Sequence, residues 1–187
     1  NNISIKAYEV IARDISDIEA KKTLYLETKK TNVAVYSSIG RGVNVVTGLN
    51  LTSIMKCHKN EIEIKNTKNA FIKDGIALVR YLNWLETGVS TGTITEMIAS
   101  EKLLEFRKQQ DLFIEDSFES ISAYGANASM PHYKPSHENP VKIEPRGLYL
   151  IDSGGHYLDG TTDITRTVAL GKLKEEEIYH YTLVLKA

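Results

Sequence analysis

The stretch Leu148–Leu170, LYLIDSGGHYLDGTTDITRTVAL, constrains the fold of this 187-residue chain more than any other segment. Its opening run LYLI is continuously apolar, as in a buried strand, and the later run DITRTV is rich in β-branched residues, which favour strands. The sequences SGG and DG between these runs are turn signals. The pattern predicts an antiparallel hairpin, and a turn centred between Tyr157 and Leu158 would place Asp152 opposite Asp163.

The two strand acids predict a metal site. Like charges that face each other across paired strands destabilise a sheet, and burying a carboxylate without a partner costs still more free energy. A cation between Asp152 and Asp163, or a shared proton, would relieve both effects. Carboxylate oxygens suit Mg²⁺, Mn²⁺ or Zn²⁺, and two carboxylates can hold a pair of ions about 3.5–4 Å apart, as in two-metal hydrolysis. We therefore predict that Asp152 and Asp163 are metal ligands.

Two other residues of the hairpin leave alternatives open. Asp159 precedes a glycine, where aspartate often caps a turn, so turn formation and metal binding are about equally supported. His156 lies near the acids in the sequence and is an alternative metal ligand.

A second candidate site is the loop sequence MPHYKP, which contains His132. Pro131 precedes this histidine and Pro135 follows three residues later, so its backbone is restrained. A restrained histidine can act as a proton donor or as an oxyanion partner near neutral pH. From the residues alone, a surface-loop histidine without a chemical role is equally well supported.

Composition limits the class of protein. A chain of 187 residues with 42% hydrophobic and 25% charged residues can form one substantial globular domain, or one and a piece. The net charge of −1 gives no reason to expect nucleic acid or an anionic membrane as a partner, and no apolar run is long enough to cross a bilayer. The N-terminus lacks the apolar core of a signal peptide, and the single cysteine, Cys57, fits a reducing compartment. We therefore expect a cytoplasmic protein.

The segment LIDSGGHYLDGTTDITRTVALG resembles the metal-binding hairpin of aminopeptidase P, the Xaa-Pro aminopeptidases. The resemblance runs from about Lys59 to the end of the chain and includes KNEIEIKNTKNAFIKDG, NWLE, EFRKQQ and PHYKP. It implies an α+β fold, the pita-bread catalytic domain that also occurs in methionine aminopeptidase, prolidase and creatinase. Residues 51–187 would be the N-terminal half of that domain, and residues 1–50 the end of a preceding α/β domain of the creatinase N-terminal type.

The same resemblance implies roles for individual residues. Asp152 would bind one ion through both oxygens and Asp163 would bridge two ions, while one histidine and two glutamates would come from later in the chain. His132 would lie near the substrate and bind it or stabilise the reacting centre. Similar proteins often carry glutamine at the position of His156, which argues against a required imidazole there.

The activity implied is a metal-dependent aminopeptidase that releases the first residue from peptides with proline at position two, through a metal-bridging hydroxide. The cofactor would be two divalent ions, usually manganese, with zinc or cobalt as alternatives. The partner would be a proline-containing peptide, and a homodimer is expected by analogy. A prolidase-type dipeptidase and a non-catalytic peptide- or histone-binding relative remain as alternatives.

Local patterns predict the remaining elements. We expect a helix over residues 14–28 and strands over residues 32–36 and 43–47. A long helix is expected from Glu61 to Thr87, with Gly88 as its C-terminal stop. Its buried stripe would contain Phe71, Gly75, Leu78, Leu82 and Leu85, widened by Ile72, Ile76 and Val79, and its basic face of Lys65, Lys68, Lys73 and Arg80 would be solvated.

The second half of the chain adds three elements. Thr93 and Glu96 predict a capping box that opens a second helix, which continues to about Gln110. Phe118–Tyr124 is expected to be a strand. A further helix is predicted from Glu175, and because the chain stops inside that pattern we expect a longer polypeptide, with only two of five metal ligands present here.

Overall fold

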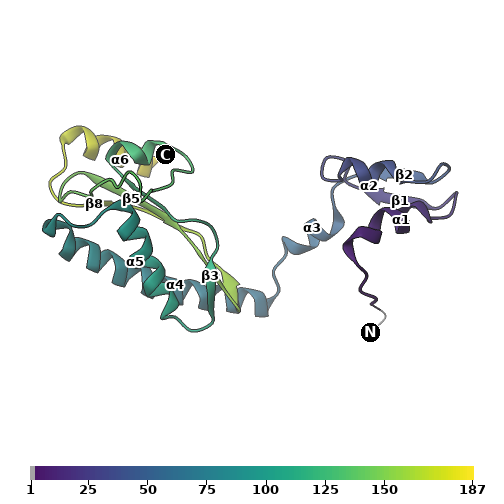
Figure 1. Cartoon of the computed structure of the whole chain (residues 1–187), viewed down its shortest axis with the longest axis horizontal. Coiled ribbons are helices and arrows are strands. Elements are labelled where there is room, and N and C mark those ends of the chain that lie inside the picture. Colours follow the sequence, from purple (N-terminus) through teal and green to yellow (C-terminus); the bar gives the residue numbers. More distant parts are fainter. Residues whose placement is uncertain (1–2) are drawn as a thin grey trace. The chain divides into compact units, whose positions relative to one another are not determined.

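The computed structural model describes residues 3–187, which divide into two compact units (Figure 1). The first unit ends at Lys59 and the second spans Asn60–Ala187. No helix within residues 3–187 combines the length and the apolar character needed to span a bilayer.

The first unit is built around a parallel pair of strands, β1 (Thr23–Leu26) and β2 (Asn44–Thr47). Parallel strands need a crossover connection, and the segment between them contains the short helix α2 (Val33–Ser37). The other elements are η1 (Tyr8–Val10), α1 (Ile11–Ser16) and α3 (Leu51–Lys56). The strand predicted over residues 43–47 is therefore confirmed, and the unit has the α/β character that was expected.

Two other predictions for the first unit are wrong. The helix predicted over residues 14–28 ends at Ser16, and Lys21 takes a left-handed conformation with φ of 69° before β1 begins. The sequence NVAVY is helical instead of extended, because the Asn32 side chain caps α2 by accepting a hydrogen bond from the Val35 N–H at 2.9 Å. In such short segments, a helix cap or a strand partner far away in the sequence determines whether the segment is helical or extended, even where local propensity favours the other state.

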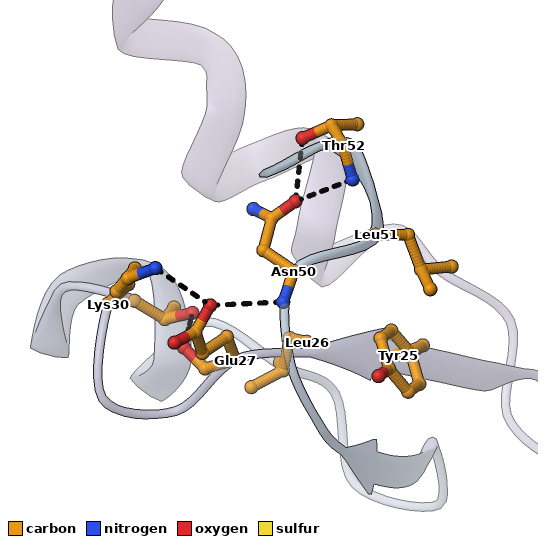
Figure 2. A pocket seen from close by; sticks show the side chains of 8 residues that line it. Tyr25, Leu26, Glu27, Lys30, Asn50, Leu51 and Thr52 are labelled. Atoms are coloured by element: carbon orange, nitrogen blue, oxygen red, sulfur yellow. Dashed lines mark hydrogen bonds and ion pairs between the residues drawn. The ribbon is translucent and has the colours of Figure 1, made fainter. Parts of the chain in front are cut away.

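A pocket of the first unit is lined by residues that form local hydrogen bonds and an ion pair (Figure 2). The Glu27 carboxylate accepts a hydrogen bond from the Asn50 N–H at 3.0 Å and lies 3.3 Å from the Lys30 ammonium. The Asn50 bond and Lys30 lower the pKa of Glu27. The Asn50 side chain in turn caps α3 by accepting from the Thr52 N–H. These polar groups serve local structure, so we assign no chemistry to this pocket.

The second unit contains two helices, two three-stranded sheets and a final helix. In chain order the elements are α4 (Glu61–Gly88), η2 (Val89–Thr91), α5 (Glu96–Lys108), β3 (Phe113–Asp116), β4 (Ile121–Tyr124), η3 (Gly125–Ser129), β5 (Leu148–Ser153), β6 (Gly155–Tyr157), β7 (Gly160–Thr161), β8 (Ile164–Ala169) and α6 (Glu175–Lys186). One sheet has the order β4-β5-β8 and the other β3-β6-β7, and all their pairings are antiparallel.

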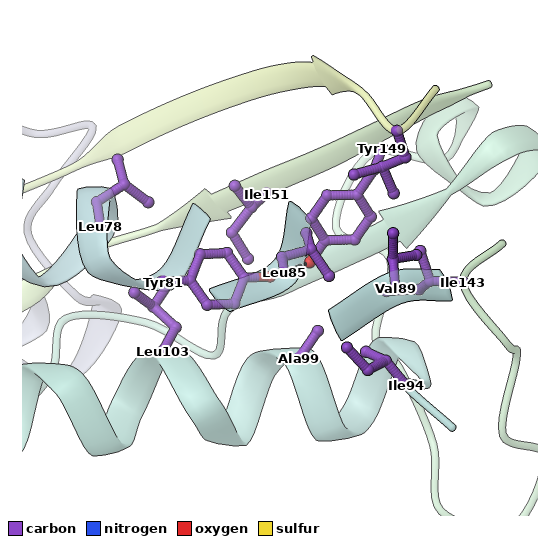
Figure 3. Packing of buried hydrophobic residues seen from close by; sticks show 11 residues of the cluster. Leu78, Tyr81, Leu85, Val89, Ile94, Ala99, Leu103, Ile143, Tyr149 and Ile151 are labelled. Atoms are coloured by element: carbon purple, nitrogen blue, oxygen red, sulfur yellow. Dashed lines mark hydrogen bonds between the residues drawn. The ribbon is translucent and has the colours of Figure 1, made fainter. Parts of the chain in front are cut away.

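The hydrophobic core lies between α4, α5 and the β4-β5-β8 sheet (Figures 1 and 3). Figure 3 shows Tyr81 and Leu85 of α4 directed toward Tyr149 and Ile151 of β5, with Leu103 of α5 completing the layer. The Tyr81 and Tyr149 hydroxyls lie 2.6 Å apart in this core, and burial raises the pKa of both phenols. The helix pair therefore covers one face of the sheet, while residues of α6 such as Tyr181 lie close to β8, where the Tyr181 hydroxyl bonds to the Thr167 carbonyl.

Helix α4 confirms the predicted span to within one residue. Asn60 caps it in a capping box with Glu63, and the helix runs to Gly88. The predicted apolar stripe is only partly buried, since Ile72 and Val79 are 62% and 68% exposed. The buried face instead includes Ala70, Asp74 and Ala77. Small residues are needed there because β7 approaches closely: a Cβ on Gly160 would lie 3.1 Å from the Ala70 Cβ.

The second predicted helix exists, but its start differs from the prediction. The cap is Thr95, which accepts a hydrogen bond from the Ile98 N–H at 3.2 Å, and the predicted capping box of Thr93 with Glu96 is wrong. The predicted strand over Phe118–Tyr124 is shorter, since β4 begins at Ile121. Helix α6 begins at Glu175 as predicted.

Candidate metal centre

The hairpin that carries the predicted ligands exists, with a register that differs from the prediction. Strands β5 and β8 pair antiparallel with Asp152 opposite Thr165, and β6 and β7 continue the hairpin with Tyr157 opposite Gly160. The turn is thus centred between Leu158 and Asp159, one residue later than predicted. The expected direct opposition of Asp152 and Asp163 is therefore wrong.

The corrected register still brings the two acids together on one face. Moving the centre of a hairpin turn by one residue changes each pairing by two residues, and side chains alternate faces with a period of two. Asp163, two residues before Thr165, therefore becomes a diagonal neighbour of Asp152 on the same face. Diagonal neighbours in an antiparallel pair are typically about 7–8 Å apart, close enough for long or ion-bridged groups to interact.

The two carboxylates differ in their surroundings. Asp152 is partly buried, and its Oδ1 accepts a hydrogen bond from the Thr165 hydroxyl at 2.7 Å. Asp163 is exposed and lies immediately before β8. Within residues 3–187, no lysine, arginine or histidine forms an ion pair with either acid.

These donors fit divalent ions as part of a larger ligand set. Carboxylate oxygens are hard donors, both acids lie on the same face, and the protein supplies no competing cation from the described residues. Across residues 3–187 no three histidine, cysteine, aspartate or glutamate side chains gather as a metal site. Asp152 and Asp163 would therefore contribute two ligands, and His156 does not join them as a third.

The other two hairpin candidates have structural partners. The Asp159 carboxylate lies 2.7 Å from the Lys73 ammonium, which lowers the pKa of Asp159. Lys73 is only 14% exposed, so the expectation that it is solvated is wrong. The His156 Nδ1 lies 2.9 Å from the Thr161 hydroxyl. Asp159 is thus a structural residue that anchors the turn to α4.

His132 lies in the loop after η3, and its side chain is exposed. Its φ of 59° places it in the left-handed region, which is uncommon for a residue other than glycine. Such strained residues occur preferentially at functional sites, where the surroundings hold them in place. Its catalytic role stays a prediction.

Comparison with known proteins identifies the family of this chain. Residues 65–187 match the sequence profile of Metallopeptidase family M24. The chain belongs to the M24 metallopeptidases. A Saccharomyces cerevisiae protein provisionally named as an Xaa-Pro aminopeptidase (FRA1) is 50% identical over 135 residues, which cover 71% of this chain and 18% of that protein. Xaa-Pro aminopeptidase 1 of Dictyostelium discoideum is 38% identical over 192 residues, covering all of this chain and 30% of that protein.

Solved structures agree with this assignment. The X-prolyl aminopeptidase from Caenorhabditis elegans, described as a cytosolic enzyme with a di-nuclear active site, superimposes with a TM-score of 0.88 at 37% identity, covering 99% of this chain and 31% of that one. An Xaa-Pro dipeptidase from Bacillus anthracis, at 24% identity and a TM-score of 0.73 over 95% of this chain and 48% of that one, shows the shared fold alone. The α+β pita-bread architecture is thus confirmed. The chain spans about a third or less of the length of the first curated relatives that it matches.

A set of buried contacts near the His132 loop that the sequence did not reveal involves Glu96. Its side chain is 1% exposed and accepts hydrogen bonds from the Tyr124 N–H at 2.6 Å, from the Asn127 amide at 3.0 Å and from the Tyr133 hydroxyl at 2.6 Å. Burial, together with the Glu96 charge, raises the pKa of Tyr133 to about 12. Glu96 thereby fixes the loop on both sides of η3, next to His132. Its partners are at least 28 residues away along the chain, so no local pattern indicated them.

A second set of residues missed from the sequence is the buried pair Asp74 and Arg107, both completely inaccessible to solvent. The Arg107 Nε donates to Asp74 Oδ1 at 2.7 Å, and its Nη1 donates to Asp116 at 3.2 Å. Burial raises the pKa of Asp116, and the nearby guanidinium opposes that rise. The sequence did carry a signal for the burial of Asp74, which lies four residues before Leu78 on the face of α4 that helical spacing assigns to the core.

Proposed function

We propose that this chain forms the part of an M24 metallopeptidase that supplies the Asp152 and Asp163 ligands of a two-ion centre, and that the whole protein is an Xaa-Pro aminopeptidase. The proposed reaction is hydrolysis of the bond between the first residue and a proline at position two. The observation that carries the proposal is the pair of acids on one face of the β5–β8 hairpin, without a protein cation from residues 3–187. The names of the relatives support the same activity.

Each residue of the site has a proposed task. Asp163 would bridge two ions and Asp152 would bind one of them, with the Thr165 hydroxyl holding the Asp152 carboxylate in position. Bound divalent ions, proposed to be manganese, would supply a water of lowered pKa and polarise the scissile carbonyl. His132 would bind the peptide or stabilise the negative charge that develops on that carbonyl. The remaining ligands would come from beyond the matched residues.

The first unit has its own proposed place in the protein. Its parallel strand pair with a helical crossover supports the view that it ends a preceding α/β domain of the creatinase type. The proposed domain boundary is at about residue 50, and the two compact units divide after Lys59. We further propose a cytoplasmic homodimer. The cytosolic description of the C. elegans enzyme supports the compartment, and the homodimer rests on the family resemblance.

The experiment that tests this function is a comparison of two aspartate variants in the full-length protein. Asp163→Asn is nearly isosteric, so it should abolish high-affinity Mn²⁺ binding and cleavage of an Xaa-Pro-Pro peptide without unfolding the protein. Asp159→Asn is the matched control, because Asp159 belongs to the same hairpin but is neutralised by Lys73. It should retain metal and activity. An Asp163→Asn protein that still cleaves the peptide would rule out the bridging role.

The alternatives are separated by the substrate and by the metal. A dipeptidase, which the fold shared with the B. anthracis enzyme allows, would cleave Xaa-Pro dipeptides and leave longer Xaa-Pro peptides intact. A non-catalytic relative would bind no ion at the hairpin. Residues 1–187 alone should bind Mn²⁺ weakly and show no turnover, because two ligands form an incomplete centre. Rapid cleavage by that fragment would contradict the incomplete-site account.

A further inference from the structure

The back of the hairpin is held by one buried ion pair. Asp74 comes from α4 and Arg107 from α5, and neither side chain has any solvent exposure. The guanidinium donates twice to the carboxylate, from Nε to Oδ1 at 2.7 Å and from Nη2 to Oδ2 at 3.3 Å. This two-point contact fixes the orientation of both groups, because a planar guanidinium and a planar carboxylate fit in few ways.

The pair also bonds to both arms of the hairpin. On the β5 arm, Arg107 Nη2 donates to the Ser153 hydroxyl at 2.9 Å. On the β8 arm, the Thr162 hydroxyl donates to Asp74 Oδ2 at 2.8 Å and accepts from the Gly155 N–H at 2.9 Å. The Tyr157 hydroxyl adds a bond to Asp74 Oδ1 at 3.0 Å. Asp74 thus accepts four hydrogen bonds, which uses the full capacity of a carboxylate.

Two of the three hydroxyls that touch the pair belong to the sequence neighbours of the two predicted metal ligands. Ser153 follows Asp152, and Thr162 precedes Asp163. Side chains alternate between the faces of a strand, so the acids lie on the accessible face while their neighbours lie on the buried one. Ser153 and Thr162 are 0% and 1% exposed, in agreement with this alternation.

From this arrangement we infer that the Asp74–Arg107 pair is a positioning device for the metal centre, an inference that rests on the proposed function of Asp152 and Asp163. Each arm of the hairpin is tied, one residue away from its ligand, to the same rigid ion pair. The separation and orientation of the two ligand carboxylates are therefore set by α4 and α5 before any ion binds. Asp74 and Arg107 act only through the backbone of the hairpin and contact neither the ions nor the substrate.

A purely structural role for the pair makes a different prediction. Burying two charges removes their hydration, so a buried ion pair contributes little net stability, and replacing it by apolar groups is often neutral. If the pair has only a structural role, its loss should weaken metal binding no more than the loss of another buried polar contact that lowers the unfolding free energy by the same amount. A positioning pair would alter metal affinity beyond its effect on stability, because ligand geometry controls affinity.

Three variants of the full-length protein distinguish these roles. Thr162→Val keeps the shape of the side chain and removes its hydrogen bonds to Asp74 and to the Gly155 N–H, whereas Thr162→Ser keeps the hydroxyl. Tyr81→Phe is the matched control, because it removes a buried hydroxyl of α4 that forms no hydrogen bond with the hairpin acids or their neighbours. The Tyr81 hydroxyl bonds to the Tyr149 hydroxyl, which also bonds to Ser122. The measurements are the Mn²⁺ affinity of the metal-free protein by titration calorimetry and its unfolding free energy in urea.

The positioning role predicts that Thr162→Val lowers Mn²⁺ affinity about 10–100-fold, the usual effect of removing a group that orients a ligand. Thr162→Ser should restore the affinity, and Tyr81→Phe should leave it unchanged although it lowers stability. If Thr162→Val does not fold, Ser153→Ala, which removes the bond on the other arm, should weaken Mn²⁺ binding in the same direction.

Two results overturn the inference, and they differ from each other. If Thr162→Val or Ser153→Ala binds Mn²⁺ as tightly as the wild-type protein, the pair does not position the ligands, and the proposed function is unaffected. If the wild-type protein and Asp163→Asn bind Mn²⁺ equally, the hairpin is not a metal site, and the proposed function fails together with the inference.

Discussion

The polar side chains on the two faces of the β5–β8 hairpin differ in whether they have bonding partners in the protein. On the buried face, Ser153 and Thr162 are bonded to an ion pair whose carboxylate has all its acceptor positions filled. On the accessible face, Asp152 and Asp163 lack an ion-pair partner among residues 3–187. The contrast separates the two proposed metal ligands from the other acids of this region, which have a basic partner. Asp159 pairs with Lys73, and Asp74 pairs with Arg107.

The largest effect on stability is expected from removing one charge of the buried ion pair. Arg107→Met leaves the Asp74 carboxylate buried without a counter-ion, so we expect a loss of about 3–5 kcal/mol in unfolding free energy. Urea denaturation of the metal-free protein measures this loss. The double variant Asp74→Leu/Arg107→Met should be more stable than Arg107→Met, because no uncompensated charge remains. A single variant as stable as the wild-type protein would show that the buried face does not depend on the pair.

The next test concerns the loop that leads to His132. Glu96→Gln retains the shape of the side chain but replaces charge-assisted hydrogen bonds to Tyr124 and Tyr133, and we expect a loss of about 1–3 kcal/mol. The pKa of Tyr133 should fall from about 12 toward its ordinary value of 10.0, without reaching it, because burial is the larger cause of its elevation. Urea denaturation and ultraviolet titration of tyrosinate measure the two effects.

The control for this variant is Glu105→Gln on the exposed side of the same helix. Its ion pair with Lys102 is open to solvent, so its removal should change stability by less than about 0.5 kcal/mol. Equal losses from Glu96→Gln and Glu105→Gln would contradict the assignment of Glu96 as the residue that fixes the loop.

These buried contacts also show where the sequence was informative. Helix Glu61–Gly88 and helix Glu175–Lys186 follow from periodicity and terminal residues, which act within a few positions of the chain. The alternation of the hairpin strands was equally local, so the two acids were assigned to one face even though the turn centre was misplaced. The contacts of Glu96 and Asp74 join residues 28 to 88 positions apart, and no local pattern carries that information.

A smaller effect is expected at the turn, where an acid does have a counter-ion. The Lys73 ammonium lowers the pKa of Asp159, so this pair stabilises the fold above the unfolded pKa of about 3.8, and its contribution is lost as the pH falls through the folded pKa. Lys73→Met should therefore reduce stability near pH 7 by less than about 1 kcal/mol, and the reduction should shrink below pH of about 4. Urea denaturation at both pH values measures this, with Lys65→Met at an exposed position of α4 as the control.

The smallest effect on stability is expected from changing Asp163, on the accessible face, in the metal-free protein. Asp163 is exposed, so Asp163→Asn should change the stability of the metal-free protein by no more than about 0.5 kcal/mol. With Mn²⁺ at about 100 times its dissociation constant, the wild-type protein should gain about 2.7 kcal/mol through selective binding to the folded state, and the variant should not share that gain. Urea denaturation with and without Mn²⁺ separates the two conditions. A variant already destabilised without metal would mean that the Asp163 charge has a structural partner in the protein, and the contrast between the two faces would then be wrong.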